Sequence, residues 1–469
     1  MKTSNGQTNK SSWCLTVGSY ISFLIVLSSS LVIMNVHLSL GIVLAVIFSL
    51  LFNIFNPKRQ IGFFVPNLFY IPLVMLILND AALSNSINNY LVAHGKLIIA
   101  IWVGAIIYFF FAIIYRALPE KIVKKIFPPY FIGALLVLLS IVIIGIFGLK
   151  FIYAPLENSG KLDYIGITAI VFMVVIFYTA SNFPLHHFIR NFRALFAFGF
   201  GFFVYLVHDL ITVISNLGMD GTLYFHLFTQ INAYPTFSFI NFIEHFEFYN
   251  YLAFDWTLIL LVLPIAIISL LNDTQDQIIL EDETKRHVLP VKRNRAQLDS
   301  LVFLNGASSL STSALGAMPV NLVLADKSQR NKKHHLFIDL SLGVLLVLAL
   351  IFSFEGVFAT IPTPIYFGVL IIEASLILAR GVKLIAVSWK EESPLETLLG
   401  SSLVLIIGLI FASGYLSETF LGYTWIDLTI GNVKLNFLLL AVSAGLVFNI
   451  IYSFIKMMNK KKKEKTATN

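Results

Sequence analysis

Three polar side chains near the end of one long apolar run are the residues best placed to do chemistry in this sequence. The run covers 255–279 and contains Asn272, Asp273 and Asp276. Residues three and four apart lie on one face of a helix, so these side chains would point in the same direction. An Asp at the centre of a membrane helix costs about 2.5–3.5 kcal/mol, so such residues usually face a bundle interior and mark a solute or proton pathway. The alternative is that they form the cytoplasmic end of the run, since acidic residues follow at 281–283.

Carboxylates in this position could couple solute binding to a cation. Burial disfavours the charged form of a carboxylate, so a proton is one candidate for Asp273 and Asp276. An ionised Asp among other oxygen atoms would instead hold Na⁺, and the sequence leaves both ions open. Asp326 is a third candidate, although its neighbour Lys327 also suits the start of a cytoplasmic loop. We expect no metal or organic cofactor, because the chain has one Cys and its His residues show no metal-ligand spacing.

Two prolines interrupt short apolar runs, Pro66 in 61–79 and Pro319 in 318–326. Proline removes a backbone donor, so neither run can be helical throughout. Non-helical backbone at membrane depth is tolerated only where protein or a water-filled cavity covers it. We expect a short helix after Pro319 whose free N–H groups face such a cavity. Asn321 in its first turn would then either contact a planar heterocycle or cap the helix.

The composition indicates that lipid is the main solvent of this chain. Of its 469 residues, 58% are hydrophobic and 12% are charged, whereas soluble domains have about 45–50% apolar and about 25% charged residues. A helix needs about 20 apolar residues to cross a bilayer, and runs of that length recur along the chain. We therefore predict an all-α polytopic membrane protein with fourteen transmembrane segments, at 14–35, 37–56, 61–79, 96–115, 127–149, 163–181, 193–215, 255–279, 298–315, 318–326, 336–358, 362–380, 396–415 and 433–456.

The basic residues predict the orientation of these segments. Lys and Arg are retained on the cytoplasmic side of short loops. If the N-terminus is cytoplasmic, the loops on the opposite side hold only Lys96, Lys150, Lys161 and Lys434 of the 32 basic residues. Both termini are therefore predicted to be cytoplasmic, in a multi-pass protein of the plasma membrane. The net charge of +7 then reflects this topology and the anionic headgroups of the lipid bilayer, so no nucleic-acid partner is expected.

The interrupted runs occupy the third place in each half of the predicted order. Short or broken segments in corresponding positions of two halves are typical of transporters built from inverted repeats. We therefore predict a 7+7 inverted repeat. Its parts would be a cytoplasmic N-terminus (1–13), a first repeat (14–215), an extracellular aromatic linker at the interface (216–254), a second repeat (255–456) and a basic cytoplasmic tail (457–469). No phosphate-binding loop or nucleophile–base pattern is found, so the chain is predicted not to be an enzyme.

Four stretches in order along the chain resemble a known family of transporters. They are "IFPPYFIGALLVLLSIVIIGIFG" at 126–148, "LPIAIISLLNDTQDQ" at 263–277, "FLNGASSLSTSALGAMPVN" at 303–321 and "IPTPIYFGVLII" at 361–372. Their Pro pairs, their Asn-Gly and Gly-Pro spacing and their order are similar to those of the nucleobase–cation symporters, which include uracil and xanthine permeases. The resemblance covers most of the chain and implies the same fold.

The resemblance also implies a set of site residues. The Glu-His pair and the later His of the family's eighth segment fall on Asn272, Asp273 and Asp276. The Asn-Thr-Thr of the tenth segment falls on Val320, Asn321 and Leu322, and the aromatic pair of the third segment falls on Asn67 and Phe69. The family has an acidic residue at two of these places, the Glu of the eighth-segment pair and the Glu of a Gly-Glu pair in the tenth segment. This chain lacks both, and Asp273 and Asp326 each lie one residue away from the corresponding position.

Two transport functions follow from this resemblance. The first is alternating access of a core unit (segments 1–4 and 8–11) against a gate unit (segments 5–7 and 12–14), carrying a nucleobase with a proton or sodium ion; relatives often form homodimers through the gate units. The second is an anion transporter or channel of the same architecture, similar to those for bicarbonate and sulfate, which the missing carboxylates favour. The sequence leaves the solute, the coupling ion and the direction of transport open.

Overall fold

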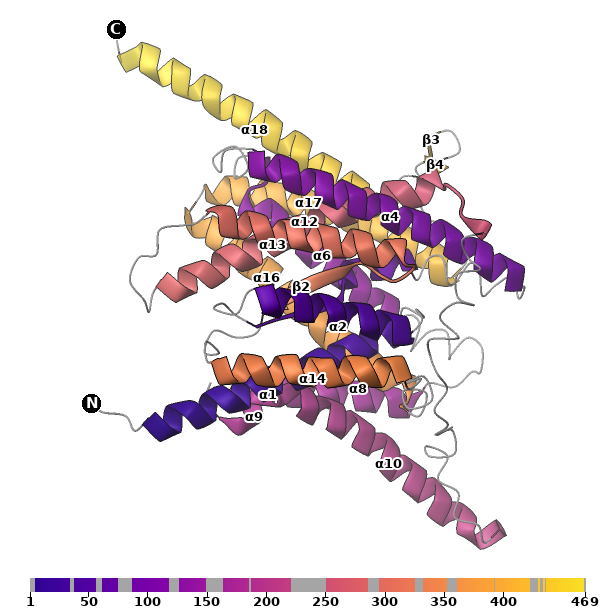
Figure 1. Ribbon diagram of the computed structural model, residues 1–469. Helices are drawn as coiled ribbons and strands as arrows, with labels where there is room; N and C mark the ends of the chain where they lie inside the picture. Colours follow the sequence, from indigo (N-terminus) through magenta and orange to yellow (C-terminus); the bar gives the residue numbers. More distant parts are fainter. Residues whose placement is uncertain are drawn as a thin grey trace. The chain divides into compact units, whose positions relative to one another are not determined.

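The computed structural model contains two compact units, and each combines segments from both halves of the chain (Figure 1). Unit 1 comprises Met1–Leu68, Phe147–Asn250 and Ser311–Glu373, and unit 2 comprises Phe69–Ile146, Tyr251–Leu310 and Ala374–Asn469. The residues that the structure describes are 5–33, 38–55, 61–74, 87–117, 126–148, 163–184, 187–220, 250–285, 295–324, 332–351, 361–391, 393–421, 429–430, 433–434 and 436–467. Most of the predicted interfacial linker at 216–254 lies outside these ranges.

Helices form where the long apolar runs predict them. Every predicted segment except 318–326 contains α-helix, although in 61–79 the described helix covers only 71–74. The other helices are α1 (Asn5–Ile33), α2 (Leu38–Phe55), α4 (Ile87–Ala117), α6 (Pro129–Gly148), α8 (Tyr164–Ser181), α10 (Arg193–Asp220), α12 (Trp256–Lys285), α13 (Arg295–Ala314), α14 (Lys332–Ile351), α16 (Thr363–Glu391), α17 (Pro394–Leu421) and α18 (Phe437–Ala467), and a short α9 (Phe188–Asn191) precedes α10.

Several of these helices are suited by length and composition to cross a bilayer. Within the described ranges, five stretches are long and apolar enough: Val92–Ile114, Pro129–Ile146, Tyr164–Ser181, Pro394–Ser413 and Phe437–Met458. Shorter apolar stretches occur in α1, α2, α10, α12 and α14. Since about 20 apolar residues are needed to cross the hydrocarbon region, the five longer stretches are sufficient on their own.

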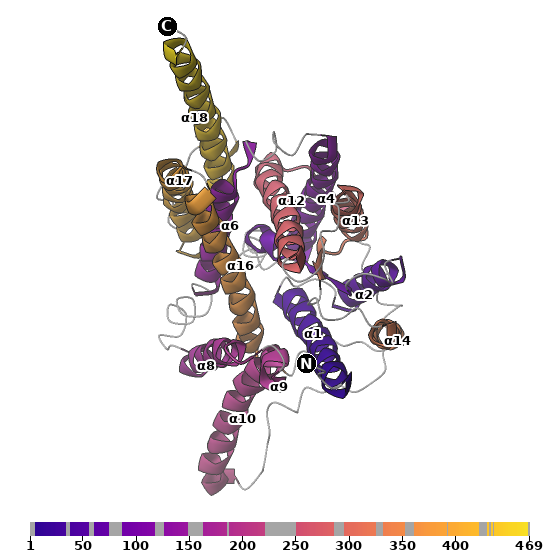
Figure 2. The ribbon, with the colours of Figure 1, turned by 90° about the vertical axis from the view of Figure 1, so that its left-hand side faces the viewer.

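Unit 1 is built around α1, α2, α8, α10 and α14. In this unit α8 lies along α10, α2 lies along α14, and α1 contacts α2, α9 and α10 (Figure 2). The start of α8 is fixed by Asp163, whose side chain accepts a 2.8 Å hydrogen bond from the backbone N–H of Gly166. This bond satisfies one of the backbone donors that every helix start leaves unpaired.

A short antiparallel sheet occupies both interrupted segments of unit 1. β1 (Gly62–Pro66) pairs with β2 (Val320–Leu324), with Val65 opposite Asn321 and Pro66 opposite Val320. The non-helical backbone predicted at both prolines is therefore confirmed. The prediction of a short helix directly after Pro319 is wrong, because these residues form β2. Pairing with β1 satisfies the backbone groups on the facing edges of both segments inside the protein, and β-branched residues such as Val320 suit an extended strand.

Unit 2 is built around α4, α6, α12, α17 and α18. Here α4 lies along α12, α17 lies along α18, and α12 also contacts α18 (Figure 2). α6 and α16 approach backbone to backbone at two glycines. A Cβ atom on Gly133 would lie 2.6 Å from the carbonyl oxygen of Gly381, and a Cβ atom on Gly381 would lie 2.7 Å from that of Gly133. Small residues at such crossings let membrane helices approach closely.

The start of α18 differs from the sequence prediction. The segment predicted from 433 begins with the strand β4 (Val433–Lys434), which pairs with β3 (Thr429–Ile430), and the helix starts only at Phe437. Asn436 explains this later start, because its side-chain oxygen accepts the backbone N–H of Leu439 at 2.9 Å and caps the helix.

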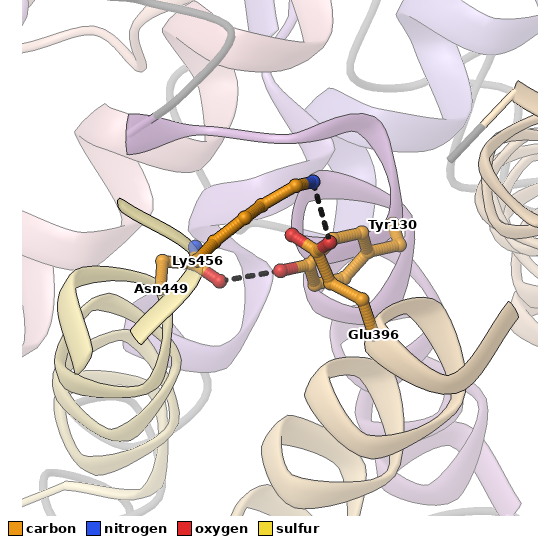
Figure 3. A network of polar contacts seen from close by, with 4 residues as sticks. All are labelled: Tyr130, Glu396, Asn449 and Lys456. Atoms are coloured by element: carbon orange, nitrogen blue, oxygen red, sulfur yellow. Dashed lines mark hydrogen bonds and ion pairs between the residues drawn. The ribbon is translucent and has the colours of Figure 1, made fainter. Parts of the chain in front are cut away.

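Polar contacts tie three helices of unit 2 together near the start of α6 and α17 (Figure 3). The hydroxyl of Tyr130 on α6 donates to the side-chain oxygen of Asn449 on α18 at 2.7 Å, and the Asn449 amide donates to the carbonyl of Ile126 at 3.1 Å. Lys456 on α18 forms an ion pair of 3.4 Å with Glu396 on α17. These contacts hold α18 against α6 and α17.

Candidate functional site

A buried carboxylate lies where three helices of unit 2 meet. Asp273 on α12 is 7% exposed. Its Oδ2 atom accepts a 2.5 Å hydrogen bond from the hydroxyl of Tyr108 on α4 and a 2.9 Å hydrogen bond from the side-chain amide of Asn305 on α13. Tyr108 and Asn305 are themselves buried. Two side chains from other parts of the sequence therefore converge on this acidic group.

Small residues allow the three helices to approach this carboxylate. Ala112 of α4 and Ala266 of α12 belong to the same buried apolar cluster as Tyr108. On α13, a Cβ atom at Gly306 would lie only 3.2 Å from the Cδ1 atom of the Tyr108 ring. Gly306 therefore lets α13 place the neighbouring Asn305 amide beside the tyrosine hydroxyl.

The hydrogen bonds around Asp273 suit a negative charge. An ionised carboxylate only accepts hydrogen bonds, and both Tyr108 and Asn305 act as donors to it. Burying a charge is costly unless it is paired or hydrogen-bonded, and these two donors offset part of that cost. A cation that bound or left here would change the hydrogen bonds that join α4, α12 and α13, so the arrangement can link charge to helix packing.

The other acidic candidates are described less completely. Asn272 is buried next to Asp273, with 7% of its surface exposed. Asp276 lies on α12, but its side chain is outside the described residues, and Asp326 lies outside them altogether. The structure therefore gives no contacts for Asp276 and Asp326, and their roles stay predictions.

A pair of asparagines lies at the β1–β2 sheet of unit 1. Asn67 follows β1 directly, and its backbone N–H donates to the carbonyl of Pro319 at 2.8 Å. Its side-chain amide donates to the side-chain oxygen of Asn321 on β2 at 3.2 Å. Asn67 is 4% exposed. Asn321 is thus a strand residue bonded to Asn67, so the expectation that it lies in the first turn of a helix is wrong. Its contact with a solute stays a prediction.

Helix α2 holds the outer edge of β1. The backbone N–H of Phe64 donates to the Ser49 hydroxyl at 2.8 Å, and the backbone N–H of Gly62 donates to the side-chain oxygen of Asn53 at 2.9 Å. Ser49 and Asn53 are four residues apart, so they lie on one face of α2. Alternate N–H groups of β1 are thereby satisfied by side chains of α2, which fixes the position of the strand that leads to Asn67.

The remaining predicted residues lie on the same two interrupted segments. Val320 opens β2 and is buried, and Phe69 lies in η1 (Leu68–Tyr70) and is also buried. The structure therefore brings together Asn67 with Asn321, and Asp273 with Tyr108 and Asn305. Contacts of Phe69 or Val320 with a solute stay predictions.

Two residues of the carboxylate cluster were not predicted from the sequence. Tyr108 stands in the apolar run "AIIYFFFA", and a tyrosine there reads as ordinary membrane-helix packing. Asn305 belongs to the Asn-Gly pair of the motif at 303–321, and the small residue after it is the one local signal of a close approach. Neither residue reveals Asp273 as its partner, because the three positions are far apart in sequence.

Solved structures show which fold this arrangement belongs to. The transmembrane domain of the bicarbonate transporter BicA from a cyanobacterium aligns with a TM-score of 0.43 and 12% identity, over 93% of this chain and 97% of that one. SLC26A9 aligns with a TM-score of 0.52 and 12% identity, over 95% of this chain and 65% of that one. Murine Slc26a9, described as an anion transporter in the inward-facing state, aligns with a TM-score of 0.51 and 13% identity, over 97% and 69%.

The likeness to the two SLC26A9 structures confirms the predicted fold class, a polytopic all-α protein with a 7+7 repeat. This chain spans 65% of the length of SLC26A9, so the likeness concerns the membrane fold alone. A comparison with curated protein sequences finds no match.

The family is identified by its sequence profile. The profile of the xanthine and uracil permeases, described as a permease family, matches residues 38–415. This match covers well over half of the chain and includes all four motifs, both strands of the interrupted segments and the Asp273 cluster. The chain is a multi-pass membrane transport protein, and it belongs to the xanthine/uracil permease family.

Proposed function

We propose that this protein is a secondary active transporter of a nucleobase of the uracil or xanthine type, coupled to a proton or a sodium ion. The observation that carries the proposal is the pairing of β1 with β2, which joins the two interrupted segments through Asn67 and Asn321. Interrupted segments in corresponding places of two repeats are where transporters of this kind bind their solutes.

The asparagine pair suits the edge of a planar heterocycle. Each side-chain amide carries two N–H donors and an oxygen acceptor, and the two amides are joined by the bond between Asn67 and Asn321. Nucleobases present alternating donors and acceptors along one edge, so an amide pair can match them without a charged side chain. The amide pair therefore supports a nucleobase as the solute, even though this chain lacks the acidic residues that the family has in its eighth and tenth segments.

The buried carboxylate supports cation coupling. Asp273, with Asn272 beside it, is buried at the end of the apolar stretch of α12, where an acidic residue is expensive and usually functional. We propose Asp273 as the main coupling residue and Asp276 and Asp326 as further contributors. The ion is a proton or Na⁺; no cofactor is involved in the proposed cycle.

The proposed cycle is alternating access of segments 1–4 and 8–11 against segments 5–7 and 12–14, as in related permeases. We place the protein in the plasma membrane with both termini in the cytoplasm, because of the uneven distribution of its basic residues. A homodimer through segments of the gate is the proposed assembly.

Ligand binding to the purified full chain tests the solute class. Uracil, xanthine, guanine, bicarbonate and sulfate are each added and the melting temperature is measured. A solute at 100 times its Kd stabilises the folded state by about 2.7 kcal/mol, which raises the melting temperature measurably. Stabilisation by at least one nucleobase is expected. Stabilisation by bicarbonate or sulfate alone would instead assign the chain to anion transport.

Variants then separate solute binding from coupling. Asn321→Ala should lose the nucleobase-dependent shift, whereas Asn182→Ala, which removes an exposed side chain beyond the end of α8, should keep it. Asp273→Asn should abolish uptake driven by a cation gradient in proteoliposomes while nucleobase exchange across the membrane continues. Gradient-driven accumulation at the wild-type rate in Asp273→Asn would remove the coupling assignment.

A further inference from the structure

The last part of α18 continues as a helix beyond the region where protein covers it. Asn449 is buried, with 5% of its surface exposed. From Phe454 to Met458, in contrast, every residue is exposed. Five consecutive residues point to all sides of an α-helix, so no face of α18 packs against the described part of the protein there. Phe454 and Met458 are 57% and 56% exposed, which means that apolar side chains on this stretch need a lipid environment.

The length of α18 places its end at the membrane surface. Its apolar stretch, Phe437–Met458, has 22 residues. At 1.5 Å per residue this is about 33 Å, close to the roughly 30 Å of the hydrocarbon region. The residues directly after Met458 therefore enter the headgroup layer. They include the run Lys460–Lys465, which has five lysines and one glutamate.

The basic run is a direct continuation of the membrane helix. α18 remains helical to Ala467, so no break separates Lys460–Lys465 from the apolar stretch. Lys456, one turn earlier, is 70% exposed at its side chain while it pairs with Glu396 at 3.4 Å (Figure 3). This ion pair and the Tyr130–Asn449 hydrogen bond hold α18 against α17 and α6 just before the basic run.

A second helix end supports this depth at the membrane surface with an interfacial tryptophan. α16 ends in the exposed residues Trp389 and Lys390, and α17 begins four residues after Lys390 with the turn that contains Glu396, the partner of Lys456. Trp389 is 45% exposed. Tryptophan is enriched at the membrane–water interface, where its ring lies at the level of the headgroups. The ends of α16 and α18 therefore share an interfacial position, whereas the lysines cluster on α18, because Glu391 and Glu392 follow Lys390.

We propose that the basic run Lys460–Lys465 binds the phosphate groups of anionic phospholipids in the leaflet that faces the cytoplasm. Headgroup phosphates are the first anions that the run meets, because it begins where the apolar stretch ends. Each lysine near an anionic membrane surface contributes about a fivefold gain in binding. The run is thus an anionic-lipid site on the same helix that Tyr130 and Glu396 hold against α6 and α17.

Protease protection tests this site without any knowledge of the transported solute. The full chain is placed in nanodiscs of phosphatidylcholine alone or with phosphatidylglycerol, and trypsin cleavage after Lys460–Lys465 is followed over time. Cleavage should be about tenfold slower or more with phosphatidylglycerol at low salt, and this protection should vanish at about 1 M salt, where electrostatic attraction is screened. Equal cleavage rates in both lipids at low salt would overturn the proposal.

Two variants that each lose four positive charges distinguish a specific lipid site from a general effect of net charge. In one, Lys460, Lys461, Lys462 and Lys463 are replaced by Gln; in the control, Arg116, Lys121, Lys124 and Lys125 of another predicted cytoplasmic loop are replaced by Gln. Native mass spectrometry in detergent measures retained phosphatidylglycerol against phosphatidylcholine. The first variant should lose most of the preference for the anionic lipid and the control should keep it. Equal losses in both, or retention by the first variant, would reject the site, and neither result depends on nucleobase transport.

Discussion

Asn67 and Asn321 are 254 residues apart in the chain, and a 3.2 Å hydrogen bond joins their side chains. The backbone N–H of Asn67 also reaches the carbonyl of Pro319, at 2.8 Å. Each residue belongs to the third segment of its repeat, so the two repeats are joined through the segments that proline prevents from being helical. The sheet between β1 and β2 and this side-chain bond together form one structural element.

The asparagine bond should be measurable as a coupling energy. Asn321→Ala removes the acceptor of the buried Asn67 amide and Asn67→Ala removes the donor to the half-buried Asn321, and each should lower the free energy of unfolding by about 1–3 kcal/mol. The double variant should cost less than the sum of the single ones, because the second substitution removes a bond that is already broken. Unfolding in detergent with increasing dodecyl sulfate measures all three. Strict additivity would show that the two side chains do not interact.

The support of β1 by α2 leads to a second prediction. Ser49→Ala removes the acceptor of the Phe64 N–H and should destabilise the protein by about 1–3 kcal/mol, since a buried backbone donor is left unpaired. Ser140→Ala is the matched control. Ser140 is also a buried helix serine, and its hydroxyl donates to the carbonyl of Leu136 just as the Ser49 hydroxyl donates to that of Ala45, so the control matches Ser49 except for the bond from Phe64. The melting temperature should fall clearly for the first variant and little for the second; equal shifts would contradict the role of Ser49.

The sequence predicts the segments well because each depends on local composition. The helix α8 begins and ends within a residue of the predicted 163–181, since Asp163 provides a cap and the apolar run provides the length. The interruption at Pro66 and Pro319 was also predictable, because proline acts on its own backbone. The local sequence of 318–326 does not reveal a strand, since the extended form of β2 depends on pairing with β1, a segment from the other repeat.

The carboxylate cluster shows the same limit. Asp273 stands out in an apolar run by its charge alone, and its burial is seen in the structure. Tyr108 and Asn305 have no such signal, because their importance lies in a contact between helices that a single sequence does not encode locally. A glycine beside a polar residue, as in Asn305-Gly306, is the kind of pattern that could have directed attention to this place.

The hydroxyl of Tyr108 should matter for transport more than for folding. Tyr108→Phe keeps the ring in its buried cluster and removes only the donor to Asp273, so the melting temperature should fall by a few degrees at most. Gradient-driven uptake should fall about tenfold, which corresponds to the roughly 1.5 kcal/mol that a hydrogen bond to a charged group contributes. Tyr178→Phe, at a 40% exposed position on α8, is the control and should transport normally. Normal uptake by Tyr108→Phe would separate this tyrosine from coupling.

The close approach of α6 and α16 provides the last prediction. Gly133→Ala would bring a methyl group within 2.6 Å of the carbonyl oxygen of Gly381, and neither partner is the end of a flexible side chain. The helices would have to separate, so the variant should lose about 1–3 kcal/mol of stability, as overpacked interiors do. Gly199→Ala and Gly343→Ala are controls on α10 and α14, where a Cβ atom would have no neighbour within 4 Å. Because alanine favours a helix over glycine by about 1 kcal/mol, these controls should melt at the wild-type temperature or slightly above it. A melting temperature of Gly133→Ala equal to that of the controls would show that the two helices do not touch at Gly133 and Gly381.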